Sequence, residues 1–152
     1  MTDVFKLLKA DHDRHRAILA KLDDLRGDSA KRRELFEDFR IEVTAHANAE
    51  EQSLYSVMLG NPELQKEGRH SVAEHKEIDD FLEELQDLDM ATPEWDETFR
   101  QMKHRYEHHI DEEEEDIFPA AEEELSRACE NEMGEVFAER KAAEKAEIAA
   151  DT

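Results

Sequence analysis

The chain has 152 residues, enough for one domain with a hydrophobic core, and we expect a single domain. Its 42 acidic residues against 20 basic ones give a net charge of -22, which would repel nucleic acid and anionic lipid, so we expect neither a nucleic acid nor a membrane partner. Only 4 Gly and 3 Pro accompany 41% charged residues, a balance typical of long amphipathic helices and therefore of an all-α fold. The sequence has no apolar run of about 18 residues and no secretory pattern at its start, so we expect a cytoplasmic location.

Capping residues predict two helices in the first half of the chain. Thr2 or Asp3 can cap the first helix, and Asp28 or Ser29, directly after Gly27, can cap the second. Each helix has an inward stripe at steps of three and four residues. The stripes are Phe5, Leu8, His12, His15, Leu19 and Leu22, and then Phe36, Phe39, Val43, His46, Glu50 and Leu54. Histidine and glutamate side chains are therefore expected to point into the core.

Proline marks both helices predicted in the second half. Asn61 can cap a third helix with Pro62 in its first turn, and Thr92 can cap a fourth that starts at Pro93. Pro119 is expected to end or kink the fourth helix. The stripes are Ser71, His75, Ile78, Leu82, Leu85 and Leu88, and then Phe99, Met102, Tyr106, His109, Glu113 and Ile117.

A weaker fifth helix is predicted from residue 120 to about residue 148. This stretch is rich in Ala and Glu and has one apolar seam. The seam consists of Leu125, Cys129, Met133, Val136 and Phe137. We expect the extension, residues 120–152, to pack on the rest of the chain or on a partner, which would make the protein a monomer or a homodimer through this helix.

An internal repeat relates the two halves of the chain, because adding 63 to a residue number leads to a similar residue. The matched positions are Asp11-His12 with Glu74-His75, Leu19 with Leu82, Leu22 with Leu85, Phe36 with Phe99, His46 with His109, Glu50-Glu51 with Glu113-Glu114, and Tyr55 with Phe118. Two helical hairpins, at about residues 3–60 and 62–119, can close on each other. We therefore predict an antiparallel up-down four-helix bundle over residues 1–119, followed by the fifth helix.

Six inward polar residues interrupt the apolar stripes of this predicted bundle. They are His12, His46, Glu50, His75, His109 and Glu113. Burying them without partners would cost roughly 1–3 kcal/mol each, so they must bond to one another, as in a metal-free structural bundle, or bind a metal. Four imidazoles and two carboxylates without a thiolate suit iron, manganese or zinc. Their repetition on four helices favours a metal site, and one with two ions, because a single tetrahedral ion would leave ligands unused.

His15 breaks the repeat, because its matched position is Ile78. It could be a further metal ligand, a proton donor beside an open coordination position, or a core histidine.

The remaining histidines and acids near the site are given lesser roles. His70, His104 and His108 are expected on the surface. The run from Glu112 to Asp116 is expected to be mostly solvated with only Glu113 turned inward, while Glu51 and Glu114 could serve as alternative ligands if a helix rotates.

The motifs His46-x-x-x-Glu50-Glu51-x-x-Leu-Tyr and His109-x-x-x-Glu113-Glu114-x-x-Ile-Phe-Pro, with His12 and Glu74-His75, resemble the hemerythrin HHE cation-binding domain over about residues 3 to 120. The resemblance implies a non-haem di-iron centre, oxo- or hydroxo-bridged when oxidised, with zinc or manganese as the alternative metals. It also implies roles for the inward residues. His12, His46, His75 and His109 would be terminal ligands, with Glu50 and Glu113 bridging and His15 as a candidate addition.

This resemblance leaves several functions open, because the family contains oxygen carriers, oxygen or nitric oxide sensors, iron sensors and iron-centre repair proteins. Oxygen carriers have a histidine where this chain has Ser71, and they end in His-x-x-x-x-Asp where this chain has Glu113 and Glu114 after His109. The four-His, two-Glu set looks more like the repair and sensing branches. We expect a centre that binds, senses or reacts with a small oxidant such as dioxygen, nitric oxide or peroxide. The alternatives are iron storage, sensing or repair without redox turnover, and the metal-free bundle.

Overall fold

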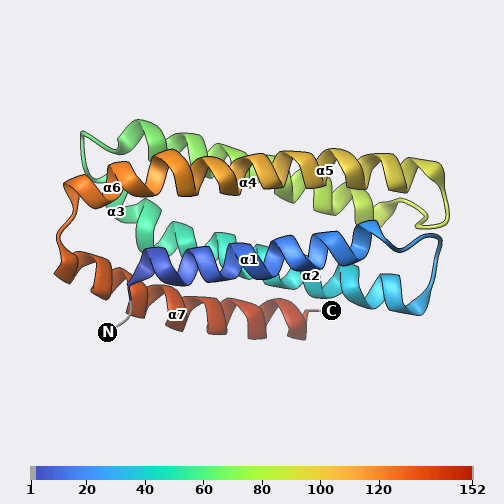
Figure 1. The fold of residues 1–152 in the computed structure, drawn as a ribbon. Helices are drawn as coiled ribbons and strands as arrows, with labels where there is room; N and C mark the ends of the chain where they lie inside the picture. Colours follow the sequence, from blue (N-terminus) through green and yellow to red (C-terminus); the bar gives the residue numbers. More distant parts are fainter. Residues whose placement is uncertain (1–2, 152) are drawn as a thin grey trace.

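The computed structural model describes residues 3–151, in which four of the five long helices form two antiparallel hairpins. Helix α1 (Val4–Asp23) returns as α2 (Ala30–Glu50), and α4 (Gln65–Asp87) returns as α5 (Pro93–Glu112). Figure 1 shows the α1–α2 hairpin and the α4–α5 hairpin lying face to face along their lengths. The predicted all-α, antiparallel four-helix bundle with a fifth helix is confirmed.

Three of the predicted helix caps are present. The side chains of Asp3, Ser29 and Thr92 accept hydrogen bonds from the first turns of α1, α2 and α5. The other candidate for the first cap, Thr2, lies outside the described residues.

The predicted cap of the third helix is wrong. Helix α4 begins at Gln65 and not beside Asn61. The Asn61 side chain instead accepts from the Glu63 amide, and the Leu64 amide donates to the Asn61 carbonyl, which makes residues 61–64 a turn. Leu64 is buried in the core, so its burial holds this turn in place.

Both hairpins contain a π-helical turn directly after a site residue. Helix α2 continues as η1 (Glu51–Tyr55) and α3 (Ser56–Leu59), while α5 continues as η2 (Glu113–Ile117) and α6 (Phe118–Glu124). Such wide turns are frequent at functional sites. Pro119 was expected to end or kink the fourth helix. It lies in the first turn of α6, so the chain stays helical there and the helix does not end at this residue. The π-helical turn directly precedes Pro119, so the proline ring lies where the regular α-helical hydrogen bonding of the backbone is already interrupted.

The hydrophobic core has two separate clusters with polar residues between them. One contains Phe5, Leu8 and Leu54, and the other contains Leu19 and Phe99. Along α1, His12 and His15 lie between Leu8 of the first cluster and Leu19 of the second. The polar layer is therefore closed off by apolar packing on both sides.

Helix α7 (Arg127–Ala150) packs along α1 and α2 of its own chain (Figure 1). Its Met133 and Phe137 are buried, and the Phe137 ring meets the His46 ring edge-on at 5.5 Å between centroids. The fifth helix therefore reaches one side of the polar layer.

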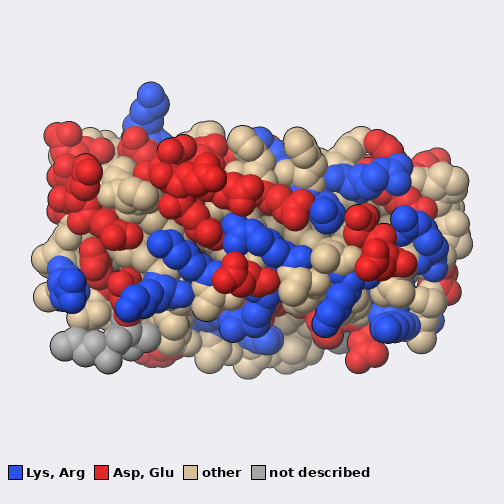
Figure 2. All heavy atoms as spheres, viewed as in Figure 1, with Lys and Arg blue, Asp and Glu red and all other residues tan. Residues whose placement is uncertain are grey.

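No described helix is both long and apolar enough to cross a membrane. On the face drawn in Figure 2, acidic side chains gather over α5 and α6, and basic side chains lie over α1.

Candidate metal centre

The structure brings the six predicted site residues together in the middle of the bundle. Each is at most 5% exposed. His12, His75 and His109 lie on α1, α4 and α5, His46 and Glu50 lie on α2, and Glu113 begins η2. The inward stripes read from the sequence therefore do meet at one place. Their role as ligands stays a prediction.

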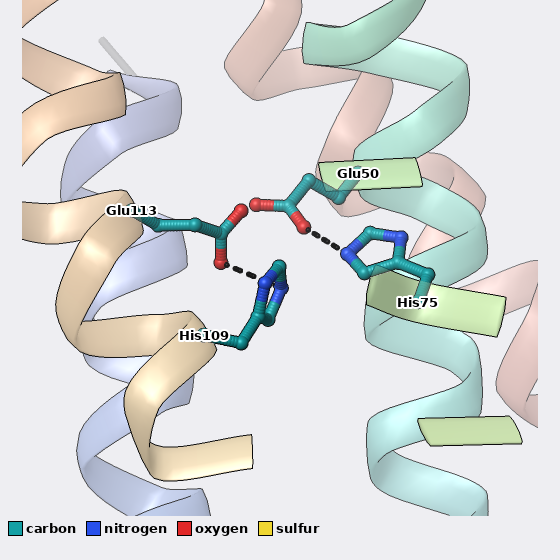
Figure 3. A group of neighbouring side chains, drawn as sticks. All are labelled: Glu50, His75, His109 and Glu113. Atoms are coloured by element: carbon teal, nitrogen blue, oxygen red, sulfur yellow. Dashed lines mark ion pairs between the residues drawn. The ribbon is translucent and has the colours of Figure 1, made fainter. Parts of the chain in front are cut away.

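Two carboxylates lie at the centre of this group. Figure 3 shows the Glu50 and Glu113 side chains reaching toward each other from facing helices. His75 Nε2 lies 3.0 Å from Glu50 Oε1, and His109 Nε2 lies 3.3 Å from Glu113 Oε1. Potential ligand atoms of these four residues lie within 4.8 Å of one another, which is close enough for one cation to contact all of them.

A second group of donors shares one of these carboxylates. Ligand atoms of His12, His46 and Glu50 also lie within 4.8 Å of one another. His12 Nε2 is 3.3 Å from Glu113 Oε1, and His46 Nε2 is 3.9 Å from Glu50 Oε1. Because Glu50 belongs to both groups, the arrangement suits two neighbouring ions with a shared carboxylate.

Several buried atoms in this layer have no hydrogen-bond partner. They are Nε2 of His12, Nε2 of His46, both carboxylate oxygens of Glu50 and Oε1 of Glu113. An unpaired buried polar atom costs roughly 1–3 kcal/mol, and native proteins rarely contain several side by side. Some of these atoms face each other as ion pairs, as His12 Nε2 and Glu113 Oε1 do at 3.3 Å, but none of them makes a hydrogen bond. The residues therefore fit a bound cation, which would coordinate all of them.

All four histidines are oriented by a second carboxylate. In each, the outer ring nitrogen Nδ1 donates a hydrogen bond to an acid, which leaves Nε2 free to face inward. The pairs are His12 with Glu114 at 2.6 Å, His46 with Asp11 at 2.8 Å, His75 with Glu51 at 2.8 Å, and His109 with Glu74 at 2.8 Å. These pairs follow the internal repeat, so each half of the site is supported in the same way.

Sequence reasoning missed most of this support. Asp11 and Glu74 were given no role, although the repeat matches them to each other. Glu51 and Glu114 were considered as alternative ligands if a helix rotates, but the structure places them at Nδ1 of His75 and His12. The expectation that only Glu113 turns inward in its acidic run is therefore incomplete, because Glu114 reaches His12.

The pKa values of three site residues are shifted, and not all in the same direction. Burial would lower the pKa of His12, but the nearby Glu113 and Glu114 carboxylates raise it to about 9. Burial, with the nearby Glu113 charge, raises the pKa of Glu50 well above its usual value. Burial would also raise the pKa of Glu113, but His109 and His12 lower it well below its usual value. Both shifts favour the protonated forms of Glu50 and His12, so a cation would compete with protons at these two residues.

His15 lies beside the six residues and not among them. It is buried, its Nδ1 lies 2.7 Å from the Tyr106 hydroxyl, and its Nε2 lies 3.5 Å from Glu42 Oε1 without a hydrogen-bond partner. Burial lowers its pKa, which favours the neutral imidazole. Ligand atoms of His15, Asp11 and His46 lie within 4.8 Å, so the prediction of an inward imidazole near the site agrees with the structure.

Tyr55 and Phe118 occupy matched positions of the repeat but have different contacts. The Tyr55 hydroxyl donates to Glu113 Oε2, and the Phe118 ring stacks on His12 at 5.9 Å. The two halves of the site therefore differ beyond His15. The sequence had matched the two positions without giving the hydroxyl group a role.

A small cavity lies next to the histidines between α2, α4 and α5. It is lined by Val43, His46, Ala47, His75, Ile78, Asp79, Tyr106 and His109. Its volume of about 10 Å³ is close to the space that one water-sized sphere occupies. The cavity thus has room for a very small molecule beside the candidate ligands.

Comparison with known proteins agrees with this geometry. The hemerythrin HHE cation-binding domain family matches residues 3–121. The crystal structure of a hemerythrin HHE cation-binding domain-containing protein from Mycobacterium kansasii superposes with a TM-score of 0.85 at 26% sequence identity, over 97% of this chain and 90% of that one. No curated protein sequence matches the chain. The chain belongs to the hemerythrin HHE cation-binding domain family.

Proposed function

We propose that the protein holds two iron ions in the buried layer and that this centre binds or reacts with a small oxidant such as dioxygen, nitric oxide or peroxide. The observation that supports this most strongly is the set of buried nitrogen and oxygen atoms without a hydrogen bond on His12, His46, Glu50 and Glu113. The histidines would hold the ions through Nε2, and Glu50 and Glu113 would lie between them. Zinc or manganese would suit the same donors.

The protein side chains fix the geometry of such a centre. The acids at Nδ1 set the tautomer of each histidine and raise the basicity of its inward nitrogen. Apolar clusters on both sides limit water, which strengthens electrostatic interactions inside. When bound, the iron ions would supply Lewis-acid and redox chemistry toward the oxidant.

The cavity beside His75 and His109 supports a very small ligand. Its size of about 10 Å³, close to that of one water-sized sphere, excludes organic substrates and leaves room only for a very small molecule. Tyr106 lines this cavity, and its hydroxyl is hydrogen-bonded to His15. We therefore propose that His15 and Tyr106 hold a proton near the bound ligand, and that His15 is not a metal ligand.

The protein is proposed to act as a monomer. Met133 and Phe137, the central residues of the α7 seam, are buried against the chain's own bundle. This packing covers the central part of the apolar seam that was considered as a homodimer interface.

A second candidate is iron storage, sensing or repair without redox turnover. The observation that favours it is the near-symmetry of the site, in which all four histidines have the same support and Ser71 stands where oxygen carriers have a further histidine.

The visible spectrum of the reduced, iron-loaded protein would separate the two candidates. It is recorded before and after addition of oxygen, nitric oxide or peroxide. Our proposal expects new absorption in the oxo-iron region with at least one of these molecules. An unchanged spectrum with all three would leave only the storage, sensing or repair function.

A further inference from the structure

A second group of histidine and glutamate side chains lies on the outside of the α4–α5 hairpin. His70 and Glu74 are four residues apart on α4, and His108 and Glu112 are four residues apart on α5. This is the spacing of His46 with Glu50 and of His109 with Glu113 in the buried layer. Residues four apart lie on the same side of a helix, so each pair presents both side chains together.

The two pairs converge across the hairpin. His70 Nε2 lies 2.7 Å from Glu112 Oε1 and 3.4 Å from Glu74 Oε1, and His108 Nε2 lies 3.5 Å from Glu112 Oε2. Ligand atoms of His70, Glu74 and Glu112 all lie within 4.8 Å of one another. The single proton of one ring nitrogen can serve only one of the two carboxylates well, whereas a cation can contact both carboxylates and the imidazole.

One side of this group is exposed to solvent, and its other side is buried in the protein. Glu74 is only 2% exposed, while the His70 side chain is half exposed. A surface hollow of about 270 Å³ is lined by His70 and Glu112 together with Glu67, Asp116 and Lys66. Arg105 Nη2 lies 3.3 Å from Glu74 Oε2 and adds one positive charge beside the group. The acids in and beside the hollow, Glu67, Glu74, Glu112 and Asp116, therefore outnumber the basic residues Lys66 and Arg105.

We propose that His70, Glu74 and Glu112, with His108 beside them, form an exposed binding site for a divalent cation of the zinc, manganese or iron(II) class. Mixed imidazole and carboxylate ligands suit these ions. Glu74 also accepts the Nδ1 hydrogen bond of His109 through Oε1, the oxygen nearest His70. An ion at this site would therefore lie one carboxylate away from the buried layer.

Zinc titration of the purified, dialysed protein tests this site by calorimetry. The variants are His70→Ala and Glu112→Gln, and His104→Ala is the matched control because His104 is an exposed histidine of α5 outside the group. Wild type and His104→Ala are expected to bind one more zinc ion per chain than the two variants, or to bind it at least tenfold more tightly. Circular dichroism checks that all four proteins have equal helix content.

Equal zinc uptake by wild type, His70→Ala and Glu112→Gln would overturn the proposal, as would an equal loss in His104→Ala. Metal that survives dialysis is counted separately by mass spectrometry. This count reports the buried layer and is expected to be the same in Glu112→Gln and wild type. Failure of the exposed site would therefore change the titration alone, and failure of the buried centre would change the dialysed metal content alone.

Discussion

Replacing Asp11 with Asn is expected to weaken metal binding without removing any proposed ligand. Asp11 is buried, and its Oδ2 accepts from His46 Nδ1 at 2.8 Å and forms an ion pair with Lys141 Nζ at 2.9 Å. An amide keeps the shape of the carboxylate but loses the charge that orients His46 and raises the basicity of its Nε2. Loss of such a partner typically costs 10- to 100-fold in metal affinity, which corresponds to about 1.4–2.7 kcal/mol.

Anaerobic iron(II) titration against a chromophoric chelator measures this change. Asp13→Asn is the control, because it removes the same charge from an exposed position of α1. Equal affinity of Asp11→Asn and wild type would refute the orienting role of the carboxylate. An equal weakening in Asp13→Asn would show that only overall charge matters.

Three further substitutions or conditions test neighbouring parts of the account. Phe137→Ala, at a 2% exposed site against His46, is expected to lower the free energy of unfolding by about 3–5 kcal/mol in thermal or urea denaturation; a loss no larger than that of half-buried Val136→Ala would contradict the packing of α7. In metal-free protein, the pKa of His12 is raised from 6.5 to about 9, so its contribution to stability is fully present below pH 6.5 and is lost as the pH rises through 9. Thermal melts of His12→Gln should lack this decline in stability at alkaline pH. His15→Ile, which copies the matched residue Ile78, should keep both ions but react with peroxide about 100-fold more slowly in stopped-flow absorbance, and an unchanged rate would remove His15 from the mechanism.

The sequence was sufficient to predict the bundle because two kinds of pattern agreed. The stripes at helical spacing fixed which face of each helix is buried, and the repeat of His46 and Glu50 as His109 and Glu113 fixed how the two hairpins correspond. The caps Ser29 and Thr92 were also readable because they act within one turn of the helix. Local rules failed at Asn61, where burial of Leu64 favours a turn before α4.

The support around the histidines could not be read from local spacing. Asp11 precedes His12 in the chain but orients His46 on the next helix, and Glu74 in the same way orients His109 instead of His75. Such pairs depend on how neighbouring helices are rotated and shifted against each other, which stripes alone do not specify. The repeat did contain the signal, because it matched Asp11 with Glu74 and Glu51 with Glu114.

The metal content of purified protein tests the central claim most directly. Protein produced in iron-supplemented cells and dialysed would be measured by mass spectrometry beside His46→Ala/Glu50→Ala and the control His104→Ala. We expect two ions per chain in wild type and in His104→Ala, and a loss of metal in the double variant. Wild-type protein without metal, or a double variant with unchanged metal content, would contradict the proposed centre.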